Sequence, residues 1–388
     1  MFENSLVFRN AQNQFYWIEK IASPVANKFE YVPALSQAEK LDYLLVPKGQ
    51  RGLGSPDLLV TDPSDGFWVI SESRASVQVR QVGDAPFGTI KCMALNAKKD
   101  LLALYSQANV AGRIIVMKAD RSAEYTRLDT GLTDAKAIDW CGNDAPVLTF
   151  PDQIVIVGPN EYEKIDLSCS VKGIRCLNEI DGLRVVTSEK TYFLERVQEK
   201  TLATFKVASI SPSAKLIQAQ KSVDLNQPRA DDIINDLGKN LMTGIQDLLE
   251  TATCEHSNVP VMKHLLRTAS FAKTFPEAST FDSNEYVEKV KTLVVLTKLR
   301  NSPNCARAIT YKQFDKFKAK NVLKLMLRFR DYHLAIVMIE HLNLKQYLSM
   351  VYDDWCQNLI RHSQASETDL QKMLEDKFNK LKIKIAEE

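Results

Sequence analysis

Apolar positions follow a different period in each half of this 388-residue chain. In the first half, short apolar runs come directly after four acidic residues, Asp57, Asp100, Asp144 and Asp181, which lie 43, 44 and 37 residues apart. A turn and a second apolar run follow each of these first runs. A repeat of about 40 residues that contains several short strands is typical of β-propeller blades, whose small sheets bury their faces against their neighbours.

The second apolar runs complete each repeat. They are residues 67–70, 113–116, 154–157 and 192–194, and residues 15–18 add an incomplete unit. We therefore expect residues 1–210 to form four to five blades of an incomplete β-propeller. Because propellers usually have more blades than this, we expect further blade sequence upstream of Met1. An antiparallel sandwich is the alternative, but its turns are more closely spaced and it has no long repeat.

After residue 228 the apolar positions recur with the period of an α-helix. The first stripe predicts one amphipathic helix and consists of Ile234, Leu237, Leu241, Ile245 and Leu248. Later stripes lie within 262–269, 287–294, 322–329, 334–342, 348–359 and 370–381. The last helix is expected to start at Ser366, with Asp369 three residues on in a capping-box arrangement.

The repeat in the first half and the helical stripes in the second together predict a β-then-α fold class, an incomplete β-propeller followed by an α-solenoid. Residues 1–210 are the partial propeller, 211–228 an extended connecting segment, and 229–388 the α-helical solenoid, in which consecutive helices with short loops stack on one another. A compact helical bundle is the alternative. Glycine usage favours the same order, because twelve of the fourteen glycines lie before residue 183, where tight turns are needed.

Charge and cysteine usage restrict the class of partner and the compartment. The chain has 50 basic and 48 acidic residues, a net charge of +2, and this field is too weak to make nucleic acid or anionic lipid the main partner. Seven cysteines without a Cys-x-x-Cys pair favour reduced thiols in a cytoplasmic protein over a disulfide framework or a zinc ribbon. No apolar window reaches the length of a membrane span, so we expect any membrane contact to be peripheral.

Candidate chemistry is sparse. No histidine precedes His256, so the first half offers no imidazole for a Ser-His or Cys-His nucleophile pair, and we expect no catalytic residues there. Cys254 and His256 lack a second pair that would complete a tetrahedral metal site, and we interpret them as loop residues. The segment 52–54, Gly-Leu-Gly, lacks the rest of a phosphate-binding loop and is interpreted as a turn. Neither a metal nor a cofactor is expected.

The densest basic stretch is interleaved with two aromatic residues, Phe314 and Phe317. Such a mixture can bind nucleic acid or a lipid headgroup. At helical spacing, however, the two phenylalanines are expected in the core and the cations on the solvated face, and we favour that interpretation. The basic residues are Lys312, Lys316, Lys318, Lys320, Lys324, Arg328 and Arg330.

A family resemblance emerges at Trp140, Cys141, Gly142, Asn143 and Asp144, which together with the following alanine resemble the Trp-Cys-Gly-x-Asp-Ala motif of the vacuolar protein sorting 16 family. Similar segments continue in the family's order to about residue 345. The matching positions in the helical half are Leu265, Leu266, Arg267, Ser270, Phe271, Lys273, Tyr311, Tyr332, Leu334 and Ala335. The family usually has glycine in place of Ala272. We expect all of these positions to be structural, with the indole and the thiol in a blade core and the residues after them in a turn.

The resemblance implies a non-catalytic scaffold, a core subunit of membrane-tethering complexes of the HOPS and CORVET type. The implied partners are other tethering subunits, including a Sec1/Munc18-type protein, and indirectly the Rab and SNARE machinery, at late endosome, lysosome or vacuole membranes. The family's opening blades and most of its C-terminal solenoid have no counterpart in this sequence. Since that solenoid carries the Sec1/Munc18-type subunit, its binding region is expected to lie outside this chain.

Two other functions remain open. One is a scaffold of the coat or nuclear-pore type, which combines a propeller with a solenoid and assembles into a lattice. The other is an enzyme built on a propeller, which is disfavoured because the sequence lacks an acid, base and nucleophile constellation.

Overall fold

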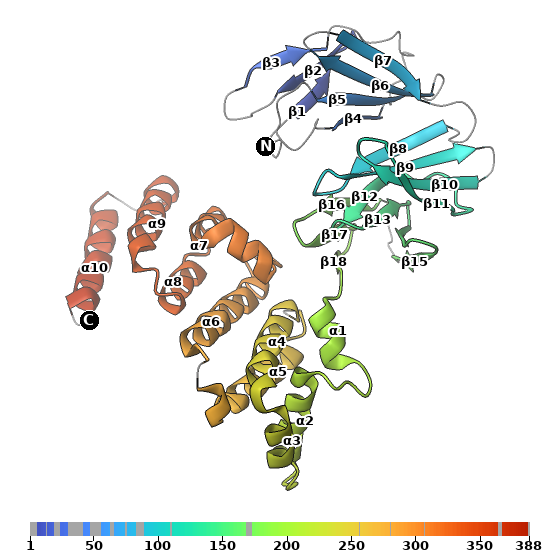
Figure 1. Cartoon of the computed structure of the whole chain (residues 1–388). Coiled ribbons are helices and arrows are strands. Elements are labelled where there is room, and N and C mark those ends of the chain that lie inside the picture. The colour runs from blue at the N-terminus through green and yellow to red at the C-terminus, as the bar shows by residue number, and fades with distance from the viewer. Residues whose placement is uncertain are drawn as a thin grey trace. The chain divides into compact units, whose positions relative to one another are not determined.

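The chain forms two compact units in a computed structural model, a β unit, Met1–Arg196, and a helical unit, Val197–Glu388 (Figure 1). The structure describes residues 6–12, 14–18, 24–29, 42–46, 56–62, 66–73, 76–82, 89–108, 111–167, 173–255, 257–279, 281–305, 307–363 and 367–386. The segment 52–54, His256 and Ser366, on which three sequence interpretations depended, lie outside the described residues.

The β unit consists of small antiparallel sheets in which each strand pairs with the next along the chain. The first sheet contains β1 Leu6–Arg9, β2 Phe15–Ile18 and β3 Ala26–Lys28; the second β4 Asp42–Val46, β5 Asp57–Asp62, β6 Gly66–Ser73 and β7 Ser76–Val82. The third contains β8 Thr89–Leu95, β9 Leu101–Ala108, β10 Ala111–Lys118 and β11 Glu124–Asp129; the fourth β12 Ala137–Cys141, β13 Ala145–Thr149, β14 Gln153–Val157 and β15 Tyr162–Asp166. The fifth contains β16 Arg175–Asn178, β17 Gly182–Val186 and β18 Thr191–Glu195.

The predicted strands are confirmed in position. The runs after the four acidic residues form β5, β9, β13 and β17, and the second runs lie in β6, β10, β14 and β18. Each apolar cluster among the described residues of the β unit lies between two successive sheets. The first strands of neighbouring sheets also contact each other, β4 with β8, β8 with β12 and β12 with β16. The structure thus describes five small sheets packed in succession, while the expected four to five propeller blades stay a prediction.

The acidic residues of the repeat fix turns and neighbouring sheets. Asp57 is buried and forms an ion pair with Arg121 of the next sheet, with 3.2 Å between Nη2 and Oδ2. Asp100 accepts a hydrogen bond from Nδ2 of Asn96 at 2.6 Å, across the turn that joins β8 to β9. Their recurrence therefore reflects repeated structural use of a carboxylate beside a strand.

The helical unit contains helices from residue 199 onward. They are α1 Glu199–Phe205, α2 Pro212–Asp224, α3 Ala230–Leu237, α4 Leu241–Cys254, α5 Val259–Ala272, α6 Ser283–Arg300, α7 Tyr311–Arg328, α8 Tyr332–His341, α9 Leu348–His362 and α10 Glu367–Ala386. Short 3₁₀ turns occur at Gly238–Asn240, Pro276–Ala278 and Lys345–Tyr347. One apolar cluster joins α2 through the first part of α6, and a second joins the last part of α6 through α9, so α6 contributes to both.

The expectation of an extended connecting segment at 211–228 is wrong. Residues 211–228 are not extended, because α2 occupies most of them. Ser211 caps this helix by accepting a hydrogen bond from the Ala214 amide, Pro212 occupies its first turn, and Leu216 is buried against α4. Helix α1 also belongs to the helical unit, which begins at Val197 rather than after residue 210.

Two predicted stripes are interrupted or rotated. The stripe from Ile234 to Leu248 is fully buried, but it spans two helices, because Gly238 ends α3 with a φ of +46° that favours glycine. In α6 the buried apolar residues are Leu293, Val295, Leu296 and Leu299, while Val287 of the predicted stripe is exposed. The sequence therefore predicted the helical period correctly, but not the boundary between α3 and α4 or the buried face of α6.

Asp139 in β12 gives the β unit a predicted dependence on pH. Burial raises the pKa of this carboxyl from 3.8 to about 6. Because the folded state holds the proton more tightly than the unfolded state, stability is greatest below about pH 4 for this group and falls as the pH rises towards about 6. Asp139→Asn removes the ionisation, so we expect a higher urea midpoint than wild type at about pH 7 and little difference at about pH 4. Asp166→Asn, at an exposed position, is the control, and an equal gain at both pH values would contradict the assignment.

Candidate protein-interaction groove

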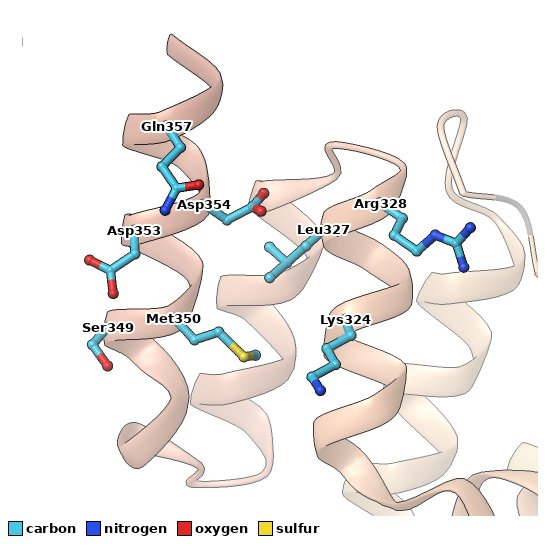
Figure 2. Close-up of a pocket in the computed structure, with 8 residues that line it drawn as sticks. All are labelled: Lys324, Leu327, Arg328, Ser349, Met350, Asp353, Asp354 and Gln357. Carbon is cyan, nitrogen blue, oxygen red and sulfur yellow. The ribbon is translucent and has the colours of Figure 1, made fainter. Parts of the chain in front are cut away.

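A groove between α7 and α9 is the candidate site, and we call it the α7–α9 groove. It has a volume of about 590 Å³, and Figure 2 shows the side chains that line it. Its lining residues are Lys324, Leu327, Arg328, Ser349, Met350, Asp353, Asp354 and Gln357. Helix α8 packs against both α7 and α9, and all three contribute to one apolar cluster. The groove is thus a surface feature of a well-packed part of the helical unit.

The lining is apolar in the middle and oppositely charged on its two sides. Leu327, only 8% exposed, and half-buried Met350 lie between the cations of α7 and the carboxylates of α9 (Figure 2). Lys324 and Arg328 are one helical turn apart, and the Arg328 guanidinium points away from α9 (Figure 2). Within the described part of the chain, the side chains of Lys324, Arg328 and Asp353 form neither a hydrogen bond nor an ion pair.

Tyr332 holds one of the two carboxylates in place. Its hydroxyl, at the start of α8, donates a hydrogen bond to Oδ2 of Asp354 at 3.1 Å. Burial, and after it this hydrogen bond, raises the pKa of Tyr332, so the phenol keeps its proton at neutral pH. One carboxylate of the α7–α9 groove is therefore oriented before any partner arrives.

Comparisons with known proteins place the chain in a family. The family model described as Vps16, N-terminal region, matches residues 75–288, more than half of the chain. The chain belongs to this family. The match confirms the resemblance inferred from the Trp140–Asp144 motif and the later segments.

Named relatives agree with the family model. Vacuolar protein sorting-associated protein 16 of Saccharomyces cerevisiae is 30% identical over 237 residues, which cover 60% of this chain and 28% of that protein. Its Drosophila melanogaster homolog is 26% identical over 284 residues, 71% of this chain and 33% of the relative. Protein VACUOLELESS1 of Arabidopsis thaliana is 24% identical over 295 residues, 75% of this chain and 33% of the relative. The chain thus matches only about one third of the length of these Vps16 relatives.

The family motif in the β unit joins two sheets. Trp140 is fully buried, and its Nε1 donates a hydrogen bond to the Ala94 carbonyl of the preceding sheet at 3.0 Å. The Cys141 Sγ donates to the Leu194 carbonyl of the following sheet at 3.3 Å. Burial raises the pKa of this thiol to about 11, so it stays protonated and unreactive at neutral pH. Both side chains therefore have packing roles.

The rest of this Vps16 motif forms the turn before β13. Gly142 has a φ of +69°, which an L-residue rarely adopts. The Asn143 carbonyl accepts a hydrogen bond from Nδ2 of Asn96 at 2.9 Å, and Asp144 forms an ion pair with Arg196. The motif thus connects the turns of neighbouring sheets.

The family positions in α5 divide between core and surface. Leu265 and Leu266 are buried, whereas Arg267 is exposed and forms an ion pair with Asp224 at 3.2 Å. Ser270 is exposed and has no structural role that the contacts reveal. Ala272 is fully buried, so only a small side chain fits where the family usually has glycine.

Aromatic contacts involve the next family positions. Phe271 meets Phe275 edge to face, with ring centroids 5.1 Å apart. The Lys273 ammonium lies 4.3 Å from the centre of the Tyr286 ring, a cation–π contact between the C-cap of α5 and α6. Tyr311 packs against both apolar clusters of the helical unit.

The last family positions, Leu334 and Ala335, are buried in α8. The structure brings only Tyr332 of all these positions to the α7–α9 groove. The basic stretch supplies Lys324 and Arg328, but nothing in the sequence marked the residues from α9. The residues from α9 are exposed or half-buried, and most of them are polar. They belong to a separate helix, and only tertiary packing brings them opposite α7.

The basic stretch is exposed along α7, as expected for a solvated face, and Phe314 is buried. The expectation that Phe317 is in the core is wrong, since this ring is 46% exposed. Helix α7 is kinked at Lys318, which has a φ of +62°, so the residues before and after it do not share one continuous helical face.

Helix α1 is a second unusual surface. Its buried residues are polar, Thr201 and Thr204, while Leu202 and Phe205 are exposed. The following loop adds two side chains that protrude further, Val207 at 92% and Ile210 at 86% exposed, so the segment 202–210 presents an apolar patch. Patches of this kind mark interaction sites or aggregation-prone surfaces.

The described residues also bear on metal binding and on membrane-spanning segments. No group of three His, Cys, Asp or Glu side chains in that part of the chain is placed to hold a metal ion. None of the described helices combines the length and the apolar character that a membrane-spanning segment requires.

Proposed function

We propose that this chain is a non-catalytic scaffold subunit of an endolysosomal membrane-tethering complex of the HOPS or CORVET type. The observation that carries the proposal is the Vps16 family match over residues 75–288, which spans strands of the β unit and helices of the helical unit. The five small sheets act in this proposal as blades of a partial β-propeller, and the helices from α1 to α10 as a solenoid.

The proposed work of the chain is mechanical. Its two units hold other tethering subunits at fixed positions. The assembled complex also contains a Sec1/Munc18-type protein, whose binding region lies outside this chain, and it brings Rab-bearing membranes and SNARE machinery together. The complex associates peripherally with late endosome, lysosome or vacuole membranes from the cytoplasmic side. The α7–α9 groove supports this proposal, because open grooves between stacked helices are well suited to protein partners.

Loss of the chain tests this role in cells. Deleting its gene should leave endocytosed marker protein in vesicles that fail to fuse with the lysosome or vacuole, because no complex would bring the two membranes together. Degradation of the marker and imaging of vesicle accumulation measure the effect, with re-expression of the intact gene as the control. Normal delivery and degradation of the marker in deleted cells would contradict the proposed function.

A further inference from the structure

We propose that the α7–α9 groove binds one α-helix of a partner protein, whose apolar stripe is flanked by acidic residues on one edge and basic residues on the other. This inference rests on the proposed scaffold function and names the class of partner that the groove takes.

The walls of the groove favour a helix over an extended peptide. Both walls are α-helices, whose backbone groups are bonded internally, so the groove offers no strand edge for main-chain pairing. Its contacts must therefore be made by side chains. Lys324 and Arg328 on one wall, and Asp353 and Gln357 on the other, are each one turn apart, which matches rows of residues four apart on a docked helix.

The middle of the groove selects an apolar stripe. Leu327 is buried but reaches the lining, and the flexible Met350 side chain lies beside it (Figure 2). Methionine adapts its shape to different apolar side chains and is frequent on surfaces that bind helices. A leucine or isoleucine row placed here would remove apolar surface from water on both partners.

The charges determine the edges of the partner. The side chains of Lys324, Arg328 and Asp353 are exposed and form no hydrogen bond or ion pair within the described residues. Those of Arg328 and Asp353 point outward, so their charges lie at the two rims of the groove (Figure 2). Asp354 is held by Tyr332 and keeps its second oxygen for a donor. A partner helix with glutamates towards α7 and lysines towards α9 would satisfy both walls, while a helix with one charge on both edges would meet repulsion at one wall.

The test uses three synthetic amphipathic helices of about 18 residues, roughly five turns. All share one leucine stripe; the first has Glu on one edge and Lys on the other, the second Glu on both edges, and the third Lys on both edges. The whole chain is titrated with each peptide by fluorescence anisotropy at low and high salt. Exchanging the two edges of the first peptide is not a control, because such a helix can dock in the opposite direction.

A pair of matched charge reversals decides the outcome. Lys324→Glu with Arg328→Glu makes both walls acidic, whereas Lys312→Glu with Lys316→Glu makes the same change of net charge on exposed residues of α7 outside the groove. Wild type and the second variant should prefer the mixed peptide. The first variant should bind the mixed peptide at least about tenfold more weakly and should prefer the all-lysine peptide.

A third variant tests the shape of the groove. Ser349 is exposed and lines the groove, so Ser349→Trp fills it without entering the core and should abolish binding of the mixed peptide. Circular dichroism melts should be the same for all variants, because only exposed positions change. Equal binding of the three peptides to wild type, equal effects of the two charge reversals, or unchanged binding to Ser349→Trp would each overturn the inference. Because the peptide test needs no other subunit, its failure is distinguishable from failure of the cellular delivery test.

Discussion

Replacing Trp140 with alanine should lower the free energy of unfolding of the β unit by about 3–5 kcal/mol. Trp140 is the largest fully buried side chain, and its cluster contains strands from the third and fourth sheets. Its removal leaves a cavity between these sheets and deprives the Ala94 carbonyl of its hydrogen bond. Since the total stability of a domain is about 5–15 kcal/mol, this loss is a large part of it.

Urea unfolding followed by circular dichroism measures this effect on the whole chain. Tyr125→Ala is the matched control, because it truncates an aromatic side chain that is exposed on the third sheet and should change stability by about 0.5 kcal/mol or less. A Trp140→Ala midpoint equal to that of the control would show that the motif does not hold the two sheets together.

Gly112→Val should lower the free energy of unfolding of the β unit by about 3 kcal/mol, nearly as much as Trp140→Ala. A Cβ atom at position 112 in β10 would overlap the Leu132 carbonyl and the Tyr105 ring. Neither can yield easily, since Tyr105 is fully buried and its hydroxyl donates to that same carbonyl at 2.7 Å. The close approach of backbone and ring therefore requires glycine at this position.

The control for this steric effect introduces the same side chain elsewhere. Glu163→Val places valine at an exposed position of β15, and valine is well suited to a strand. The free energy of unfolding should therefore change by about 0.5 kcal/mol or less. Urea midpoints of the two valine variants should differ clearly. Similar midpoints would mean that the space around Gly112 adapts to a larger side chain, and would contradict the requirement for glycine.

The sequence predicted the strands well because each repeat has a local signal. An acidic residue, an apolar run and a turn lie within a few positions of one another, and Asp57 and Asp100 use their carboxylates to fix a neighbouring sheet or turn. Trp140 and Cys141 are buried between sheets, and the residues after them form the turn before β13. The number of propeller blades is a property of the whole assembly, and local patterns do not determine it.

The boundaries and buried faces of the helices were harder to predict, because a cap or kink changes which residues are buried while the apolar residues keep their helical spacing. Gly238 divides one apolar stripe between two helices, and the kink at Lys318 leaves Phe317 exposed although its spacing from Phe314 is helical. Helix α2 was missed because its buried residues, such as Leu216 and Ala219, are spaced among polar ones.

The α7–α9 groove could not be predicted from the sequence. Its two walls are separated along the chain by α8, and its residues, except Leu327 and Met350, look like an ordinary polar surface. Their significance comes from the packing that places unpaired charges of opposite sign across an apolar strip. Lys324 and Arg328 were named in advance only as part of a solvated basic face, and the contact of the family position Tyr332 with Asp354 is tertiary.

Purification of the tagged chain from its own cells at native expression shows whether this Vps16-family chain is a scaffold within a tethering complex. Mass measurement and quantitative mass spectrometry of the purified particle give its size and subunit ratios. We expect one heteromeric particle that contains other vacuolar protein sorting subunits in fixed stoichiometry with this chain. A chain recovered alone, or in a lattice of coat or nuclear-pore subunits, would contradict it.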